Sequence, residues 1–254
     1  MDTSDPSFIA RPDTIPRWII EVIRLVQQAA LAQGIEFVIV GATARDIALH
    51  SVFGLAPGRK TVDLDFAFTV ETWEQFATLK SALVATGYFH QVNRVSQRLL
   101  YQGKLPVDLI PFGGVEENGE IAWPPSHDEV LNVSGFKDAL ASAISVQVDA
   151  DLVVPIVSLA GLTVLKLLAW ADRKRETNKD ADDLRRMLQD YGSAGNMDRL
   201  YGEELNVLEE AKFDFEVAGA RLLGKDLECF RYLLLIDRLH NILTKALISD
   251  FNTN

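Results

Sequence analysis

The sequence is poor in the residues that build disulfide frameworks and transition-metal centres. Its 254 residues include a single cysteine, Cys229, and only four histidines, none spaced from another as metal ligands are. An intrachain disulfide and a multi-cysteine zinc site are therefore excluded. The chain also lacks a Gly-x-Ser-x-Gly elbow, a Walker loop and a Gly-x-Gly-x-x-Gly turn, so serine hydrolases, P-loop proteins and dinucleotide-binding folds find no support.

Basic residues are in short supply as well. Lys and Arg number 25 against 36 Asp and Glu, which gives a formal net charge of −11. This excludes a wholly basic nucleic-acid coat but leaves room for a local basic groove. A long apolar run is also missing, because Pro155 and Lys166 interrupt the stretch 152–171. With an acidic, polar N-terminus, we expect a soluble cytoplasmic protein with no membrane partner.

Apolar residues make up 48% of the chain and charged residues 24%, which is the composition of a globular protein with a substantial core. Strand and helix signals mix up to about residue 155, and only helical signals follow. We therefore predict an α+β fold, with a mixed β-sheet flanked by helices and a C-terminal helical unit. The expected domains are 1–154, which is the α/β domain, and 155–254, which is the helical domain.

Hydrophobic periodicity and turn residues set the expected elements. A hairpin turn is expected at 103–104, and 113–135 is expected to be mostly loop with one short strand. A short buried strand is expected just before residue 158. The other expected strands are 37–40, 61–70, 98–101 and 107–110, and the expected helices are 16–33, 44–50, 72–85, 158–171, 180–191, 198–224 with a break, and 227–248.

Three aspartates on the expected strands are the most informative residues. Asp63 and Asp65 are two residues apart, so an extended strand points both to one face. At roughly 4 Å and an effective dielectric of about 20, two such carboxylates repel by about 4 kcal/mol, a cost that a bound Mg²⁺ or Mn²⁺ removes. Asp108 lies among apolar residues on a later strand and would complete a set of three. The alternative is that all three are solvated aspartates on half-buried strands.

Gly41 follows an expected strand directly and opens a helix. A glycine there lets the backbone approach a ligand closely, and the free amides of Ala42, Thr43 and Ala44 would bind an anion at the helix N-terminus. The alternative is a simple tight turn that Thr43 caps.

In this order the motifs resemble the DNA polymerase β-type nucleotidyltransferase superfamily. Gly41-Ala42 after a strand, Arg59-x-Thr61-x-Asp63-x-Asp65 and the distant Asp108 carry the resemblance. More narrowly, the chain is similar to the AbiEii/MenT-like nucleotidyltransferases, a group that contains type IV toxin–antitoxin toxins. Lys166 on a helix and the acidic run 179–184 fit that group's later motifs. The resemblance spans residues 36 to 190.

The resemblance implies a role for each matched residue. Asp63 and Asp65 would hold the divalent metal, and Asp108 would assist deprotonation of the acceptor hydroxyl or hold a second ion. Lys166 would neutralise phosphate charge, or it is simply a lysine that reaches solvent from a helix edge. Asp180 or Asp183 would orient this lysine or contact the nucleotide or acceptor. The phosphate-binding residues would be Gly41, Ala42, Thr43, Arg59 and Thr61.

Basic residues near the acidic run offer a further possible contact. Arg173, Lys174 and Arg175 are placed to bind a polyphosphate or an RNA backbone, or they belong to a solvated helical surface.

Two departures from the superfamily pattern stand out. The superfamily usually has Gly-Ser or Gly-Gly where this chain has Gly41-Ala42, so a hydroxyl is missing there. The gap between Gly41 and Asp63 is also longer than usual, with 51–60 as the inserted part.

The implied activity is transfer of a nucleoside monophosphate from an NTP to an acceptor hydroxyl, with Mg²⁺ or Mn²⁺ as cofactor and release of pyrophosphate. The resemblance suggests RNA, particularly a tRNA end, as acceptor, and an antitoxin protein as partner. The acidic net charge keeps a cationic small molecule such as an aminoglycoside open as acceptor. A third possibility is a nucleotide-binding regulatory module with a degenerate site, for which Ala42 is the main indication.

Overall fold

The computed structural model describes residues 7–59, 63–93, 95–173 and 177–228. The chain divides into two compact units, Met1–Leu162 and Thr163–Asn254, which we call unit 1 and unit 2. The division falls within one helix, a little beyond residue 154, and the predicted domains 1–154 and 155–254 stay a prediction.

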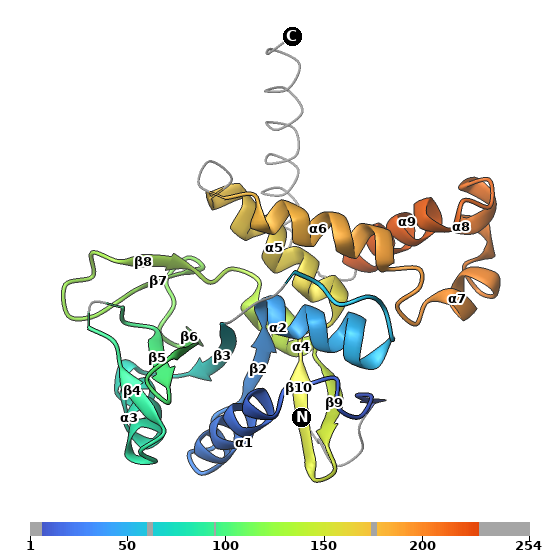
Figure 1. The fold of residues 1–254 in the computed structure, drawn as a ribbon. Helices are drawn as coiled ribbons and strands as arrows, with labels where there is room; N and C mark the ends of the chain where they lie inside the picture. Colours follow the sequence, from blue (N-terminus) through green and yellow to red (C-terminus); the bar gives the residue numbers. More distant parts are fainter. Residues whose placement is uncertain (1–6, 60–62, 94, 174–176, 229–254) are drawn as a thin grey trace. The chain divides into compact units, whose positions relative to one another are not determined.

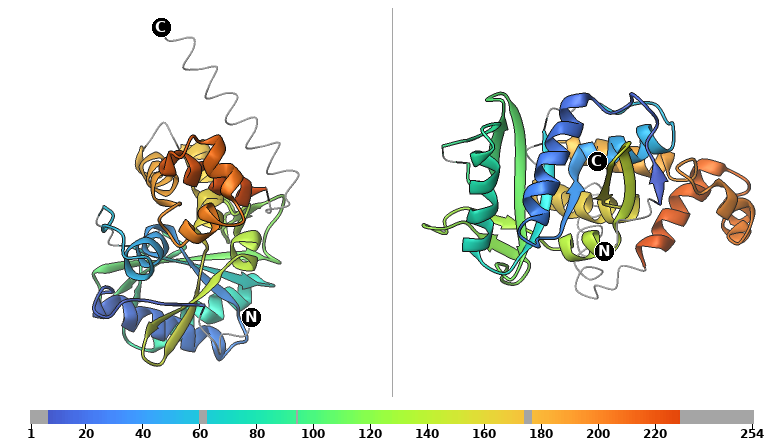
Figure 2. Two further views of the ribbon diagram at one scale, coloured as in Figure 1. Left: turned by 90° about the vertical axis from the view of Figure 1, so that its right-hand side faces the viewer. Right: turned by 90° about the horizontal axis from the view of Figure 1, so that it is seen from below.

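Unit 1 is built on a mixed sheet of eight strands, in the order β1-β9-β10-β2-β3-β6-β5-β4 (Figures 1 and 2). The pairs β1/β9, β10/β2 and β3/β6 are parallel, and the other neighbours are antiparallel. A separate two-stranded sheet pairs β7 with β8. The strands are β1 (Phe8–Ile9), β2 (Phe37–Val40), β3 (Leu64–Val70), β4 (Phe89–Gln91), β5 (Arg98–Tyr101), β6 (Leu105–Gly113), β7 (Glu120–Ala122), β8 (Val130–Asn132), β9 (Ile144–Asp149) and β10 (Leu152–Ile156).

Helices of unit 1 pack on this sheet and on one another. Helix α1 contacts α3, α4 contacts β2 and β6, and α2 contacts both β2 and β3. Helix α2 continues directly into the π-helical segment η1. The helical segments are α1 (Arg17–Leu31), α2 (Gly41–Asp46), η1 (Ile47–Val52), α3 (Trp73–Ala85) and α4 (Phe136–Ala141).

The centre of the sheet is apolar on one face of β3. Leu64, Phe66, Phe68 and Val70 alternate along the strand, and all four are completely buried. The rings of Phe66 and Phe68 lie 6.3 Å apart between centroids, and Phe37 on β2 lies 6.2 and 6.0 Å from them. This aromatic cluster holds β2 against β3, and it leaves the opposite face of β3 for Asp65.

Unit 2 is helical throughout its described part. It takes in most of α5 (Leu159–Arg173), and then α6 (Lys179–Asp190), α7 (Met197–Tyr201), α8 (Leu205–Glu210) and α9 (Phe215–Leu227). A partly buried polar link joins the end of α6 to α7 and α9, because Asp226 on α9 accepts hydrogen bonds from the Tyr191 hydroxyl at 2.5 Å and from Arg199 at 2.8 Å. Within the described residues, no helix combines the length and the apolar character that crossing a bilayer requires.

The predicted α+β fold is confirmed, and several element bounds are confirmed to within a residue or two. Several differences occur. The segment 113–135 contains two short strands instead of one, and 198–224 forms three helices instead of two. Strands β1, β4 and β9 and helix α4 were not expected. Most of the expected helix 227–248, together with Cys229, lies outside the described residues.

The packing of β3 predicts that unit 1 depends strongly on Phe66. We expect Phe66→Ala to lower the free energy of unfolding by about 3–5 kcal/mol, since it leaves a cavity between β2 and β3. Urea unfolding followed by circular dichroism measures this. The control is Leu31→Ala, because Leu31 is 69% exposed and should change the value by less than about 0.5 kcal/mol. Equal effects of the two variants would contradict this packing.

Candidate functional site

The turn between β2 and α2 requires glycine for two reasons. Gly41 has φ +70°, a left-handed conformation that other residues adopt only at a cost. A Cβ at this position would also overlap the Asp65 carboxylate, coming within 2.8 Å of its Cγ. The first residue of α2 therefore lies directly against the carboxylate at the start of β3.

Thr43 fixes the same turn to the chain before β3. Its side chain is 2% exposed, and its hydroxyl donates a hydrogen bond to the backbone carbonyl of Asp63 at 3.1 Å. This hydroxyl is thus engaged within the protein, so what Thr43 can offer a phosphate is its backbone amide. Ala42 beside it is also buried.

Sheet register brings two of the three predicted carboxylates, those of Asp65 and Asp108, to one face, while Asp63 lies just before β3 and not on the expected strand. Asp65 on β3 is the direct partner of Asp108 on the parallel strand β6. Residues in register on neighbouring strands point to the same side of a sheet, so these two side chains share a face. Asp63 precedes Asp65 by two residues and interacts electrostatically with the same arginine, Arg98, as they do.

Arg98 is the residue of this cluster that the sequence analysis did not identify. It lies on β5 directly opposite Asp108. Its Nε donates to Asp108 Oδ1 and its Nη2 to Asp108 Oδ2, both at 2.7 Å. These hydrogen bonds raise the pKa of the Arg98 guanidinium, and the charges of the three carboxylates raise it further against the effect of burial. A positive charge is thus built into the acidic face.

Two of the three carboxylates suit a divalent ion. Among the described residues, no three His, Cys, Asp or Glu side chains are arranged to hold a metal ion together. Mg²⁺ does not require such a cage, because proteins usually bind it with one or two carboxylates while waters and substrate phosphates supply the other ligands. Asp63 and Asp65, as hard oxygen donors beside a glycine turn, fit that arrangement.

The rest of the predicted phosphate-binding set is only partly described. Arg59 is exposed, and its carbonyl oxygen lies 3.5 Å from an Nη atom of Arg45. Arg45 itself is only 1% exposed, and its guanidinium donates to Asp46 Oδ1 at 2.7 and 2.9 Å. This buried arginine therefore lies beside Asp46 in the last turn of α2. Thr61 lies outside the described residues.

In unit 2, Lys166 is buried with two aspartates instead of reaching solvent. Its Nζ lies 3.1 Å from Asp180 Oδ1 and 2.8 Å from Asp183 Oδ2. Arg173 adds two hydrogen bonds to Asp180, at 2.6 and 3.0 Å. Asp180 and Asp183 are at most 1% exposed, so removing one partner from such a cluster costs about 3–5 kcal/mol. Of the three basic residues singled out nearby, Lys174 and Arg175 lie outside the described residues.

The charge balance of this cluster affects how unit 2 responds to acid. Burial alone would raise the pKa of Asp180, but the hydrogen bond from Arg173 and the charge of Lys166 outweigh it, so the pKa lies below its ordinary value of 3.8. A carboxyl whose pKa is lower in the folded state stabilises that state above its ordinary pKa, and the effect is lost as the pH falls through the folded value.

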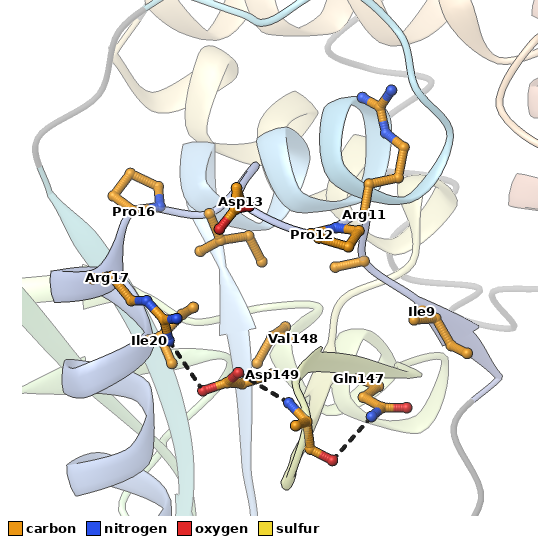
Figure 3. Close-up of a pocket in the computed structure, with 13 residues that line it drawn as sticks. Ile9, Arg11, Pro12, Asp13, Pro16, Arg17, Ile20, Gln147, Val148 and Asp149 are labelled. Atoms are coloured by element: carbon orange, nitrogen blue, oxygen red, sulfur yellow. Dashed lines mark hydrogen bonds and ion pairs between the residues drawn. The ribbon is translucent and has the colours of Figure 1, made fainter.

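A surface pocket of about 480 Å³ lies elsewhere in unit 1, between the segment 9–17 and the end of β9 (Figure 3). Arg17 Nη1 and Asp149 Oδ2 form an ion pair across it at 3.7 Å. None of the predicted site residues lines this pocket. It is therefore not the site that the carboxylates and the Gly41 turn define.

A protein-family model matches residues 24–219, which is well over half of the chain. The model describes a nucleotidyl transferase AbiEii toxin of a type IV toxin–antitoxin system. No curated protein matches the sequence.

Several solved structures share the fold only distantly. They include the antibiotic-resistance factor ANT(2″)-Ia in solution, at 16% identity and a TM-score of 0.45, with 78% of this chain and 98% of that chain covered. The same factor in complex with adenylyl-2″-tobramycin is 16% identical, with a TM-score of 0.42. In that comparison 80% of this chain and 97% of that chain are covered. An antigenic nucleotidyltransferase-like protein from Paracoccidioides brasiliensis is 17% identical, with a TM-score of 0.44. In that comparison 76% of this chain and 90% of that chain are covered. At these identities and TM-scores the likenesses say nothing of a substrate.

The contact between Gly41 and Asp65 predicts that Gly41→Ala loses the binding of ATP with Mg²⁺. The left-handed backbone costs an alanine about 1–2 kcal/mol, and the new methyl group also displaces the Asp65 carboxylate. Thermal unfolding with and without ATP and Mg²⁺ should show that the variant loses any ligand-dependent stabilisation. The matched control is Gly34→Ala, since Gly34 has φ +63° and nothing within 4 Å of its Cβ position. That variant should unfold earlier but keep the ligand effect, and loss of the effect in both variants would contradict the assignment.

The lowered pKa of Asp180 predicts a pH-dependent effect of Asp180→Asn. At neutral pH the variant should unfold at a lower temperature, because it leaves Lys166 and Arg173 short of an anionic partner. The difference from wild type should narrow as the pH falls from roughly 5 through the ordinary aspartate pKa of 3.8 toward the lower folded value, since the wild type then loses the same stabilising charge. Calorimetry across this range measures it, with Asp182→Asn, an exposed position on α6, as the control. A difference that does not change with pH would contradict the account.

Proposed function

The chain belongs to the AbiEii nucleotidyltransferase family and is a nucleotidyltransferase, and we propose that it transfers a nucleoside monophosphate from an NTP to a hydroxyl group of an RNA. One observation carries the proposed site. Gly41 opens α2 directly against the Asp65 carboxylate, and Asp65 in turn lies in register with Asp108. A helix start, whose first amides suit an anion, thus lies beside carboxylates that suit a metal ion, which supports the transfer of a charged phosphoryl group.

Asp63 and Asp65 are the proposed metal ligands. Both are half-buried at the start of β3, where carboxylate oxygens suit Mg²⁺ or Mn²⁺. When bound, the ion neutralises charge on the triphosphate and helps to orient it.

The start of α2 is the proposed phosphate cradle. The first amides of a helix have no partner within it, and they carry a partial positive charge. A phosphate bound here would accept hydrogen bonds from the backbone amides of Gly41, Ala42 and Thr43. The hydroxyl that Ala42 lacks is not needed for backbone contacts of this kind. Arg59 and Thr61 are proposed to extend the cradle.

Asp108 is the proposed third carboxylate of the reaction. In the transfer, the acceptor oxygen forms a bond to the α-phosphorus, the bond from that phosphorus to the β-phosphate oxygen breaks, and pyrophosphate leaves. The proton of the acceptor hydroxyl passes to Asp108 in one role, while in the other Asp108 helps to hold a second ion. Lys166, Asp180 and Asp183 lie in unit 2, and the phosphate-binding role that the family resemblance gives them stays a proposal.

The acceptor has two candidates. The toxin family supports an RNA acceptor, and it also supports an antitoxin protein as partner. The net charge of −11 favours a cationic small molecule such as an aminoglycoside. Incubation with α-labelled NTPs and either total RNA or an aminoglycoside panel decides between them. Label in RNA supports the first proposal, and label only in the small molecules replaces it with the second.

The central prediction concerns Asp63→Asn and Asp65→Asn. Each variant should lose label transfer by at least about 100-fold, because an amide cannot replace a charged metal ligand. Circular dichroism and thermal unfolding should stay close to wild type, because both side chains lie at the edge of the core. The matched control is Asp151→Asn, a surface aspartate paired with Arg24, which should keep full activity. Transfer retained by both site variants would remove the assignment.

A further inference from the structure

The order of the strands sets out the site residues in a row across the sheet. The Gly41 turn follows β2, Asp65 lies on β3, Asp108 on β6 and Arg98 on β5, and these four strands are neighbours in that order. The proposed phosphate cradle and metal ligands therefore lie on one side of Asp108, and Arg98 lies on the other. Because the attacking and leaving oxygens of a phosphoryl transfer lie roughly in line, the acceptor approaches from the side away from the pyrophosphate, which is the side of Arg98.

The face of β5 that carries Arg98 is the more accessible of its two faces. Arg98 and Leu100 are two residues apart on the strand, so they share a face, and both are half-buried. His90 on β4 is in register with Leu100 and is exposed. On the opposite face Tyr101 is 1% exposed, and its hydroxyl donates a hydrogen bond to Glu21 on α1 at 2.7 Å. A bound acceptor can thus extend over β5 and β4 on the face of Arg98.

The guanidinium of Arg98 uses one of its edges within the protein. Its Nε and Nη2 atoms donate to the two oxygens of Asp108, both at 2.7 Å. These are its only hydrogen bonds to the part of the chain that the structure describes, although a guanidinium has further N–H donors. The side chain is also 34% exposed. The outer edge, which Nη1 and Nη2 form, therefore keeps N–H groups for a ligand.

The chemistry of this edge favours an anionic acceptor. Parallel N–H groups that carry a positive charge match the oxygens of a phosphate, and arginine binds phosphate groups in this bidentate way. The same guanidinium would repel the amines of a cationic small molecule. The net charge of −11 describes the whole chain, whereas the group on the acceptor side of Asp108 is a cation.

We propose that Arg98 binds a phosphate of the RNA acceptor, next to the hydroxyl that receives the nucleotide, while its other edge holds Asp108. The acceptor then lies over β5 and β4, on the side of Asp108 that faces away from the triphosphate. Through this contact Arg98 selects RNA over a cationic small molecule. The inference rests on the proposed function, and it places the acceptor within the proposed site.

Binding of RNA measures this contact without catalysis. The probe is a fluorescein-labelled single-stranded RNA with a free 3′-hydroxyl, and its fluorescence anisotropy is followed with the full chain, a non-hydrolysable ATP analogue and Mg²⁺. Arg98→Gln should weaken RNA binding by about tenfold, because a hydrogen-bonded charge is lost. It should also make the slope of log affinity against log salt concentration shallower by about 0.7, since one phosphate contact disappears. The matched control is Arg24→Gln, because Arg24 is 32% exposed and pairs with Asp149 and Asp151, and it should change neither quantity.

Two further variants separate a direct contact from an effect that passes through Asp108. Asp108→Asn keeps the guanidinium and removes a negative charge, so RNA binding should stay at least as tight as in wild type. His90→Glu leaves the pair of Arg98 and Asp108 intact and adds a negative charge on β4, so RNA binding should weaken. Its control is Gln28→Glu, at an exposed position on α1, which should bind RNA as wild type does. Thermal unfolding shows which variants are folded, and if Arg98→Gln is not, Asp108→Asn and His90→Glu still test the proposal.

The outcomes distinguish this inference from the proposed function. Three results would overturn the inference: unchanged RNA binding in a folded Arg98→Gln, equal weakening in Arg98→Gln and Asp108→Asn, or unchanged binding in His90→Glu. Label transfer from NTP to RNA would leave the proposed function standing in each of these cases. A wild-type chain that neither binds nor labels RNA would overturn both. RNA binding that weakens in Arg98→Gln and His90→Glu but not in Asp108→Asn, together with label in RNA, supports both.

Discussion

The close approach of the Asp65 carboxylate to the backbone of Gly41 is the constraint on which the candidate site depends. It is possible only because position 41 carries no side chain and adopts a left-handed conformation. The antiparallel pairing of Val40 with Asp65 sets the contact, and the hydrogen bond from Thr43 to the Asp63 carbonyl secures it. Through this contact, the end of one strand and the start of the next place the turn at the start of α2 beside the carboxylates of β3 and β6.

Concentrated negative charge is handled differently in the two units. In unit 2, Asp180 and Asp183 are neutralised by Lys166 and Arg173 in a buried cluster with short contacts. In unit 1, the guanidinium of Arg98 binds both oxygens of Asp108 and also interacts with the charges of Asp63 and Asp65. Carboxylates beside a helix start suit a cation together with a polyphosphate, which is the combination an NTP brings.

Much of this could be predicted from the sequence, because the signals were local. The bounds of β2 and β5 match the predictions, since each is a short apolar run that ends at turn residues. The spacing of Asp180 and Asp183 puts both on one side of a helix. The family resemblance gave the contact with Lys166 to one of them, and in the structure both make it. Arg98 could not be assigned to the acidic face from the sequence. A turn at 103–104 leaves the register of the hairpin uncertain by one residue, and a slip of one residue turns a side chain to the other face of the sheet. Strand β9 was missed because it pairs with β1 and β10, and β1 is far away in the sequence.

The most direct test of the account is anomalous diffraction from crystals grown with Mn²⁺ and a non-hydrolysable NTP analogue. The account predicts a manganese peak bound to the carboxylates of Asp63 and Asp65, with the triphosphate against the amides at the start of α2. It also predicts that Arg98 stays on Asp108. A nucleotide bound away from the Gly41 turn, or manganese that avoids both aspartates, would contradict it.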